Sequence, residues 1–144
     1  MNIEGALLTP KKVVGDDRGQ VMHVLRSDDA NFVKFGEVYV SAIFSGVTKG
    51  WKLHTLSTSN MVVLSGNIRF VLFDAREGSQ TQGKYDDVVI GASNYQMLTV
   101  PPGVVYAWLN TEKETALILN CATELWSPNE SSNLPIETYH YAWE

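Results

Sequence analysis

Four side chains in two short segments of this chain could take part in chemistry. They are Trp51 and His54 in the first segment, and Tyr106 and Trp108 in the second. The unperturbed pKa of histidine lies close to neutral pH, so His54 is suited to accept and return a proton. The phenol of Tyr106 could hydrogen-bond a carbonyl or donate a proton, although its unperturbed pKa of about 10 would require activation. Trp51 and Trp108 could stack on a ring, and the alternative for each aromatic residue is to fill a hydrophobic core.

Two arginines are the best candidates to bind a phosphate group, because a guanidinium keeps its charge and grips phosphate in a planar fork. Arg18 follows Asp16 and Asp17, so a turn-stabilising ion pair with one of these carboxylates is the alternative. Arg76 follows Asp74, and an ion pair across that turn is the alternative there. Secondary candidates are Lys49, Lys52 and Arg69.

The elements that must position these side chains are short β-strands. Runs of β-branched and aromatic residues alternate with turn residues at intervals of roughly 8–12 residues, which is typical of an all-β sandwich or barrel. No long segment has the 3.6-residue periodicity of an amphipathic helix. The pattern therefore predicts a β-barrel with at most short helices.

Two local patterns make this prediction more specific. Residues 60–64 and 68–73 flank Ser65-Gly66-Asn67, a turn signal that predicts a hairpin between the two runs. Side chains alternate between the two faces of a strand, so Tyr106 and Trp108 are expected to share one face.

Length, charge and composition exclude several classes of protein. A chain of 144 residues, 44% of them hydrophobic, predicts one globular domain, with a barrel at about 15–126 and an extended strap at about 127–144. The net charge of −5 argues against binding to nucleic acid or to an anionic membrane surface. No apolar run approaches the roughly 20 residues that cross a bilayer, and no basic segment typical of a signal peptide begins the chain. We therefore expect a cytoplasmic protein without a membrane partner.

Two segments resemble the double motif of the cupin family. His54 and Gly66 occupy the first histidine and the closing glycine of the first motif. The second motif, Pro-x-Gly-x-x-His-x-x-x-Asn, corresponds to residues 101–110, with Tyr106 in place of the histidine. This resemblance implies a cupin-type jelly-roll barrel. Only His54 remains of the four usual cupin ligands, and a transition metal needs three or four, so no metal and no other cofactor is expected.

Three segments, in order along the chain, carry a closer resemblance. They are Asp16-Asp17-Arg18-Gly19, Leu53-His54, and Asp74-x-Arg76-x-x-Ser79-x-Thr81-x-Gly83-x-Tyr85. The chain resembles the dTDP-4-dehydrorhamnose 3,5-epimerase family and its relatives among nucleotide-sugar isomerases. Such enzymes remove a proton from a carbon next to a ketone and return it on the other face. The resemblance implies a metal-independent epimerase or isomerase of a nucleotide-linked 4-keto-6-deoxy sugar in polysaccharide precursor synthesis.

The resemblance, the two motif positions and the aromatic replacements together suggest roles within the barrel mouth. His54 would be the catalytic base, and Tyr106 would steady the enolate oxygen or return a proton. The substrate-binding candidates are Arg18, which would reach the diphosphate, together with Trp51, Trp108 and Arg76. The alternative for His54 is a histidine that only forms a structural hydrogen bond.

Several family positions are replaced in this chain. The pocket arginine of the family falls on Trp51, its lysine near Ser59, its second histidine on Tyr106, and its catalytic tyrosine on Leu125 or Trp126. These losses support a second hypothesis, a non-catalytic cupin that binds a nucleotide sugar or has a structural role.

A homodimer is the expected assembly. The resemblance implies exchange of the N-terminal strand between two copies, which would cover exposed sheet edges. The aromatic residues of 139–143 need a surface to pack on, either their own barrel or a partner subunit.

Overall fold

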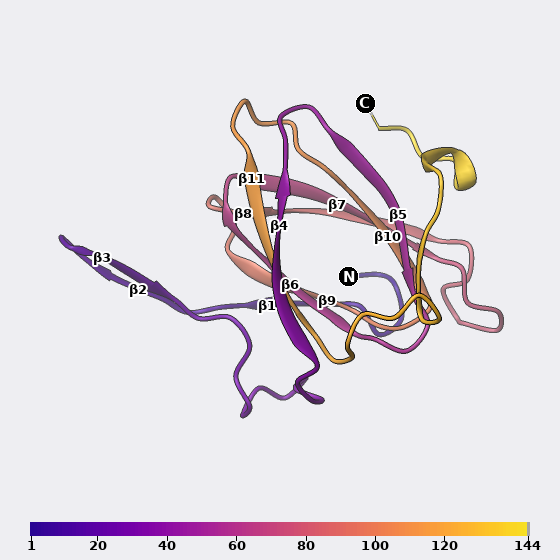
Figure 1. Cartoon of the computed structure of the whole chain (residues 1–144), viewed down its shortest axis with the longest axis horizontal. Coiled ribbons are helices and arrows are strands. Elements are labelled where there is room, and N and C mark those ends of the chain that lie inside the picture. The colour runs from indigo at the N-terminus through magenta and orange to yellow at the C-terminus, as the bar shows by residue number, and fades with distance from the viewer. Residues whose placement is uncertain (144) are drawn as a thin grey trace.

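Two packed five-stranded β-sheets form the body of the molecule in a computed structural model that describes residues 1–143 (Figure 1). The first sheet has the order β1-β9-β6-β11-β4, and the second has the order β12-β5-β10-β7-β8. The strands are β1 (Leu7–Pro10), β2 (Val13–Asp16), β3 (Gly19–Met22), β4 (Glu37–Ile43), β5 (Thr48–His54), β6 (Ser59–Ser65), β7 (Asn67–Asp74), β8 (Tyr85–Gly91), β9 (Gln96–Val100), β10 (Val104–Leu109), β11 (Ala116–Ala122) and β12 (Ser131–Asn133).

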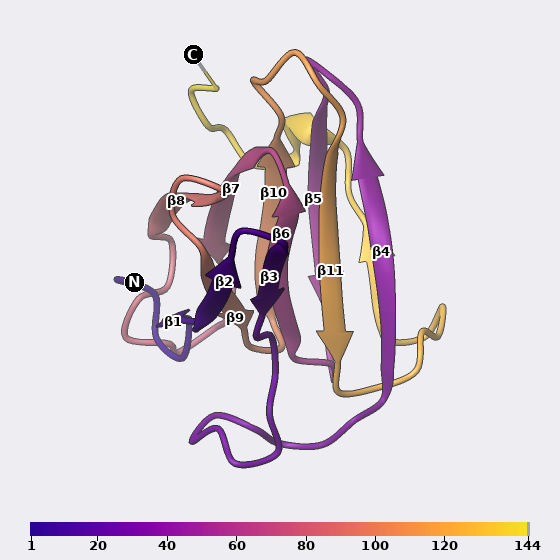
Figure 2. The same ribbon diagram turned by 90° about the vertical axis from the view of Figure 1, so that its left-hand side faces the viewer.

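The prediction of an all-β protein is confirmed. Among residues 1–143 the only helical segment is the short 3-10 turn η1 (Ile136–Thr138). Every strand pair within the sheets is antiparallel. The strands β2 and β3 form a separate hairpin that projects away from the sandwich in Figure 1 and points toward the viewer in Figure 2.

The predicted hairpin at Gly66 is wrong in its pairing. Strands form on both sides of the turn as expected, but β6 pairs with β11 and β9, whereas β7 pairs with β10 and β8. Gly66, with a φ of 79°, turns the chain from one sheet into the other. A tight turn with a left-handed glycine serves a corner between packed sheets as well as a hairpin, so the local sequence does not distinguish them.

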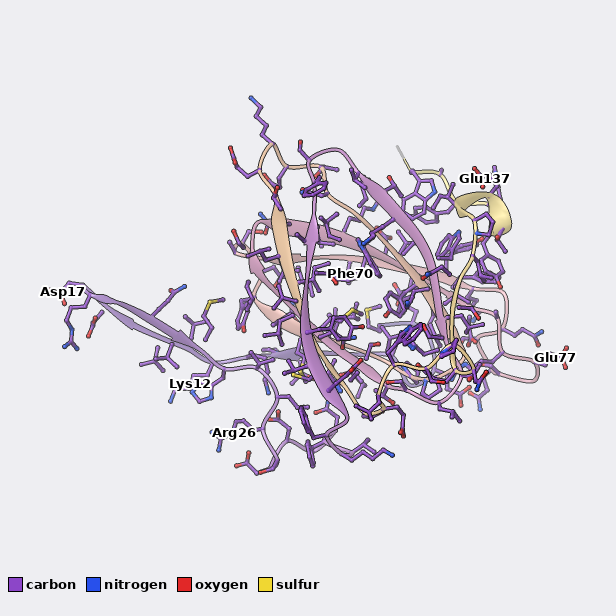
Figure 3. All side chains as sticks on the ribbon, viewed as in Figure 1. Lys12, Asp17, Arg26, Phe70, Glu77 and Glu137 are labelled. Atoms are coloured by element: carbon purple, nitrogen blue, oxygen red, sulfur yellow. The ribbon has the colours of Figure 1, made fainter. Side chains whose placement is uncertain are left out.

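The main hydrophobic core lies between the two sheets. Alternate residues of β7, Ile68, Phe70 and Leu72, belong to it and are fully buried, and Figure 3 labels Phe70 among them. Tyr106 belongs to the same core, and Trp108 packs against it. The predicted common face of Tyr106 and Trp108 is therefore confirmed.

A second hydrophobic cluster covers the opposite face of the sheet β12-β5-β10-β7-β8. Its fully buried members Trp51, Val71, Val105 and Ala107 come from three adjacent strands. The segment that follows Ser127 adds β12 to the edge of this sheet and then packs its aromatic residues, Tyr139, Tyr141 and Trp143, over the cluster. The sequence allows these aromatic residues to pack either on their own barrel or on a partner subunit, and in the structure they pack on their own barrel.

Candidate active site

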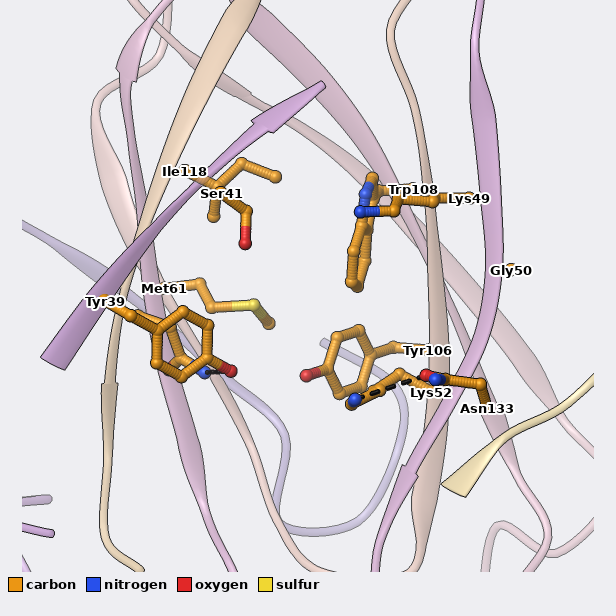
Figure 4. A pocket seen from close by; sticks show the side chains of 11 residues that line it. Tyr39, Ser41, Lys49, Gly50, Lys52, Met61, Tyr106, Trp108, Ile118 and Asn133 are labelled. Carbon is orange, nitrogen blue, oxygen red and sulfur yellow. Dashed lines mark hydrogen bonds between the residues drawn. The ribbon is translucent and has the colours of Figure 1, made fainter. Parts of the chain in front are cut away.

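A pocket of about 270 Å³ opens between the two sheets, on the side where β4 faces β5 (Figure 4). The first sheet contributes β4, β6 and β11 to its walls, and the second contributes β5, β10 and β12. The lining residues are Tyr39, Ser41, Lys49, Gly50, Lys52, Met61, Tyr106, Trp108, Ile118, Asn120 and Asn133. Hydroxyl, amide, ammonium and aromatic groups thus converge in one small volume, as in many small-molecule sites.

His54 lies beside this pocket, at the end of β5, with its ring stacked on that of Tyr106 at a centroid distance of 6.2 Å. These two residues of separate motifs therefore lie next to each other, as the sequence predicts, and of the two Tyr106 lines the pocket. His54 is only 6% exposed. Its carbonyl accepts a hydrogen bond from the backbone N–H of Gly103, at 2.8 Å, which ties the end of β5 to the turn before β10.

A buried carboxylate orients the imidazole of His54. Glu130, in the segment just before β12, lies with Oε1 2.7 Å from His54 Nδ1. Burial acts to raise the pKa of Glu130, but hydrogen bonds from His54 and from the backbone N–H groups of Ser57 and Leu56 outweigh it and lower the pKa. Glu130 is therefore an anionic acceptor, and His54 Nδ1 carries the proton that it donates.

The second nitrogen of this imidazole is left free. His54 Nε2 is buried and has no hydrogen-bond partner within residues 1–143. Because Nδ1 carries the proton in the neutral ring, Nε2 has the lone pair. Buried polar atoms normally have partners, so this unpaired nitrogen next to Tyr106 is the candidate proton acceptor of the site.

Tyr106 and Trp108 form an aromatic wall next to His54. Their rings stack with centroids 5.4 Å apart. The Tyr106 hydroxyl lies 3.3 Å from Ser59 Oγ, and burial raises the pKa of Tyr106 far above its ordinary value, so the phenol is neutral and can donate a hydrogen bond. Trp108 Nε1 is also buried with no partner in the described part of the chain, so it too can donate to a ligand.

Two lysines of β5 bring positive charge to the pocket. Lys49 and Lys52 both line it, and Lys52 Nζ donates to Asn133 Oδ1 of β12 at 3.2 Å. Burial lowers the pKa of Lys52, whereas the carboxylate of Glu130 acts to raise it. The sequence alone marks both lysines only as secondary candidates for binding phosphate.

The comparison with known proteins defines the family. The profile described as dTDP-4-dehydrorhamnose 3,5-epimerase matches residues 1–143. The chain belongs to this family. The predicted resemblance is therefore confirmed over the whole described chain.

Individual relatives agree with this assignment. The chain is 31% identical over 127 residues to the probable low-salt glycan biosynthesis epimerase Agl13 of Haloferax volcanii, an alignment that covers 87% of this chain and 81% of that protein. It is 26% identical over 145 residues to the spore coat polysaccharide biosynthesis protein SpsL of Bacillus subtilis, covering 98% and 96% of the two chains. The crystal structure of a dTDP sugar isomerase from Desulfovibrio desulfuricans G20 superposes with a TM-score of 0.91 at 36% identity, covering 94% and 87%. The cupin-type jelly-roll fold is confirmed by this likeness.

Trp51, which occupies the position of the family's pocket arginine, lies outside the pocket. It is fully buried in the outer cluster, where its Nε1 donates to the carbonyl of Ile136 at 2.9 Å. Lys52 and His54 point to the inner side, so Trp51, one residue before Lys52, points to the outer side. The structure therefore does not bring Trp51 together with Trp108.

Arg18 lies near the tip of the β2–β3 hairpin, far from the pocket of its own chain; Figure 3 labels the neighbouring Asp17. Its side chain is 85% exposed and forms the ion pair with Asp16, at 2.6 Å, that the sequence suggests as the alternative. In a single chain, Arg18 therefore does not line the pocket between the two sheets.

Arg76 also lies outside the pocket lining. Its guanidinium binds both carboxylate oxygens of Asp74 at 2.8 Å, and Asp74 also accepts from the hydroxyls of Ser79 and Thr81 at 2.6 Å each. A further N–H of Arg76 donates to the carbonyl of Glu4. The Asp-x-Arg-x-x-Ser-x-Thr pattern of the family thus builds a loop and ties it to the N-terminal segment.

Other family positions are equally displaced from the site. Leu125 and Trp126, where the family tyrosine falls, are 67% and 61% exposed. Glu130 is the functional residue that sequence reasoning missed; no motif marks it, and it lies 76 residues from His54 in the chain. Within residues 1–143 no group of three or more His, Cys, Asp or Glu could hold a metal ion, and no helix is long and apolar enough to span a membrane.

Proposed function

We propose that this protein is an epimerase of a nucleotide-linked 4-keto-6-deoxy sugar, with dTDP as the nucleotide, and that it acts in glycan precursor synthesis in the cytoplasm. Membership of the dTDP-4-dehydrorhamnose 3,5-epimerase family supports the reaction class, and the glycan and polysaccharide biosynthesis relatives support the pathway class. The reaction moves a proton on a carbon next to the C4 ketone.

The observation that carries the proposal is the free Nε2 of His54. A general base for this reaction needs a lone pair at the pocket and a partner that stabilises the imidazolium once it forms. Glu130, 2.7 Å from Nδ1, is that partner. Nε2 takes the proton from the sugar carbon, and the C–H bonding electrons move towards the ketone oxygen to form an enolate.

The aromatic wall and the lysines would bind the sugar and the enolate. The neutral hydroxyl of Tyr106 and the indole N–H of Trp108 are donors on the same wall as His54. The ammonium groups of Lys49 and Lys52 supply positive charge that the replaced family residues do not. Donors and cations that face a developing enolate lower the barrier to its formation. The pocket volume suits one sugar ring, with the nucleotide extending out of the mouth.

A homodimer would place Arg18 near a site. The projecting hairpin exposes apolar side chains, and β4 is an exposed sheet edge; the exposed valines of these two elements are Val13, Val14, Val21, Val38 and Val40. An isolated hairpin with apolar residues gains stability when a second copy covers it. We infer that the hairpin packs on the partner and presents Arg18 to the partner's diphosphate. Light scattering should then give about twice the 16.0 kDa chain mass at micromolar concentration, and a monomer would contradict this assembly.

The function is tested by solvent exchange. The protein is incubated with dTDP-4-keto-6-deoxyglucose in D₂O, and deuterium at carbons 3 and 5 is followed by NMR. The wild type should incorporate deuterium and invert configuration, and His54→Gln should lose about 10²–10⁴-fold in rate while still binding dTDP. Binding of the sugar nucleotide without exchange would instead support the non-catalytic alternative.

A further inference from the structure

Inversion at carbon requires two groups on opposite faces of the sugar. The base removes a proton from one face, and a different acid must deliver a proton to the other face; return from the base alone restores the starting configuration. Two phenols line the pocket, Tyr106 on β10 and Tyr39 on β4. Their positions relative to His54 decide which one can act as this acid.

Tyr106 stands on the same wall as the base. β5 and β10 are adjacent strands of one sheet, and the rings of His54 and Tyr106 stack. Tyr39 belongs to the opposing sheet, and Figure 4 shows its hydroxyl pointing across the cavity towards that of Tyr106. A sugar ring between the sheets therefore has His54 and Tyr106 on one side and Tyr39 on the other.

The hydrogen bonds of Asn120 leave the proton of Tyr39 available. Asn120 Oδ1 accepts from the backbone N–H of Asn60 at 3.0 Å, which fixes the orientation of the amide. Its Nδ2 therefore faces the Tyr39 hydroxyl, at 2.9 Å, and can only donate to it. The phenol oxygen is an acceptor in this contact, so its own O–H is free to donate into the pocket. The same amide N–H would stabilise the phenolate left after proton transfer.

Tyr39 is also accessible to a ligand and to water. It is 38% exposed, at the mouth of the pocket, whereas Tyr106 is fully buried. Burial raises the pKa of Tyr39 above its ordinary value, with the Asn120 contact acting in the opposite direction, so the phenol holds its proton at neutral pH. An acid at the mouth can regain its proton from solvent after each turnover.

From this geometry we infer that Tyr39 is the catalytic acid that protonates the sugar carbon on the face opposite His54, an inference that rests on the proposed epimerase function. In the first step a C–H bond breaks and an N–H bond forms on His54, leaving an enolate. In the second step the enolate carbon takes the Tyr39 proton, a new C–H bond forms with inverted configuration, and the phenolate stays paired with Asn120. Solvent then takes the proton from His54 and restores that of Tyr39, so no net charge or electron is transferred.

The test separates enolate formation from inversion. Wild type and variants are incubated with dTDP-4-keto-6-deoxyglucose in D₂O, and NMR follows deuterated substrate of retained configuration and deuterated epimer as two products. Tyr39→Phe should lower the rate of inversion at least 100-fold while exchange with retention stays within tenfold of the wild-type enolisation rate. Tyr106→Phe should slow both processes by one common factor, and Tyr141→Phe, on the outer face, should leave both unchanged.

The outcomes are distinguishable. If the wild type neither exchanges nor inverts any sugar carbon, the proposed function fails and this assignment falls with it. If the wild type inverts and Tyr39→Phe retains inversion within tenfold, only the assignment of Tyr39 is overturned. A Tyr39→Phe protein in which inversion and exchange fall together by the same factor would also overturn it, because that result describes a residue needed to form the enolate.

Discussion

The two faces of the sheet β12-β5-β10-β7-β8 carry aromatic side chains from the same strands but are built differently. On the outer face the indole N–H of Trp51 is bonded to Ile136, and its ring lies 5.6 Å from that of Tyr139. On the inner face His54 Nε2 and Trp108 Nε1 are buried without partners in residues 1–143. Within residues 1–143 no buried side-chain donor or acceptor of the outer face lacks a partner, whereas the inner face has these two. Alternation along a strand thus separates residues that stabilise the protein from residues whose polar groups remain available to a ligand.

The largest effect is expected from Glu130→Gln, which alters the inner face alone. The amide can no longer hold the imidazole of His54 in the required tautomer with a charged partner. Loss of the equivalent carboxylate in a catalytic triad costs about 10⁴-fold, so we expect the rate of solvent exchange to fall by about 10³–10⁴-fold. Exchange kinetics measure the rate, and thermal unfolding serves as the control for the fold.

In the wild type, acid should remove the contribution of ionised Glu130 to the free energy of unfolding. The pKa of Glu130 is lowered in the folded protein, so its contribution to stability is fully present above its ordinary value of about 4.3 and disappears as the pH falls through the lowered value. Glu130→Gln should therefore weaken this part of the acid dependence of unfolding. An unchanged acid profile in the variant would argue against an ionised Glu130.

Trp51→Ala should have the next largest effect, and only on the outer face. Removal of a fully buried tryptophan leaves a cavity and an unpaired carbonyl at Ile136, which should lower the free energy of unfolding by about 3–5 kcal/mol. Urea denaturation measures this change. The matched variant Trp108→Ala should weaken substrate binding with a smaller loss of stability; if Trp51→Ala acted mainly on binding, the assignment of the two faces would be reversed.

Tyr141→Phe should have the smallest effect. It removes the hydrogen bond from Arg69 Nη2, at 2.8 Å, but keeps the ring packed 5.5 Å from that of Tyr85. We expect a loss of about 0.5–1.5 kcal/mol in the same urea experiment. Tyr141→Ala, which also removes the ring, should cost clearly more; equal losses would mean that the hydrogen bond, rather than the aromatic packing, secures the strap.

The sequence predicted the strands well because turn residues and β-branched runs are local signals. It failed at the Gly66 corner, where the partner of each strand depends on contacts distant in sequence. The sequence predicts that His54 and Tyr106 lie close together, because each belongs to one of the two cupin motifs, and their rings stack in the structure. The prediction that Trp51 lines the pocket is wrong. Neighbouring side chains on a strand point to opposite faces, and Lys52 points into the pocket, so Trp51 points to the outer face.

The missed residues share a different cause. Glu130 reaches His54 only because the segment after Ser127 folds back along β5. Tyr39 and Asn120 reach the pocket because β4 and β11 pair across a separation of about 80 residues. Neither contact leaves a pattern in a single sequence, so only the three-dimensional structure can identify these residues.

The pairing of β12 with β5 has a consequence for the order in which the molecule becomes competent. Translation proceeds from the N-terminus, so both sheets except β12 emerge from the ribosome before residues 130–133. A nascent chain that ends at residue 126 would contain His54 without the carboxylate that orients it, and Lys52 without Asn133. The segment that closes the edge of the sheet is thus also the segment that completes the site.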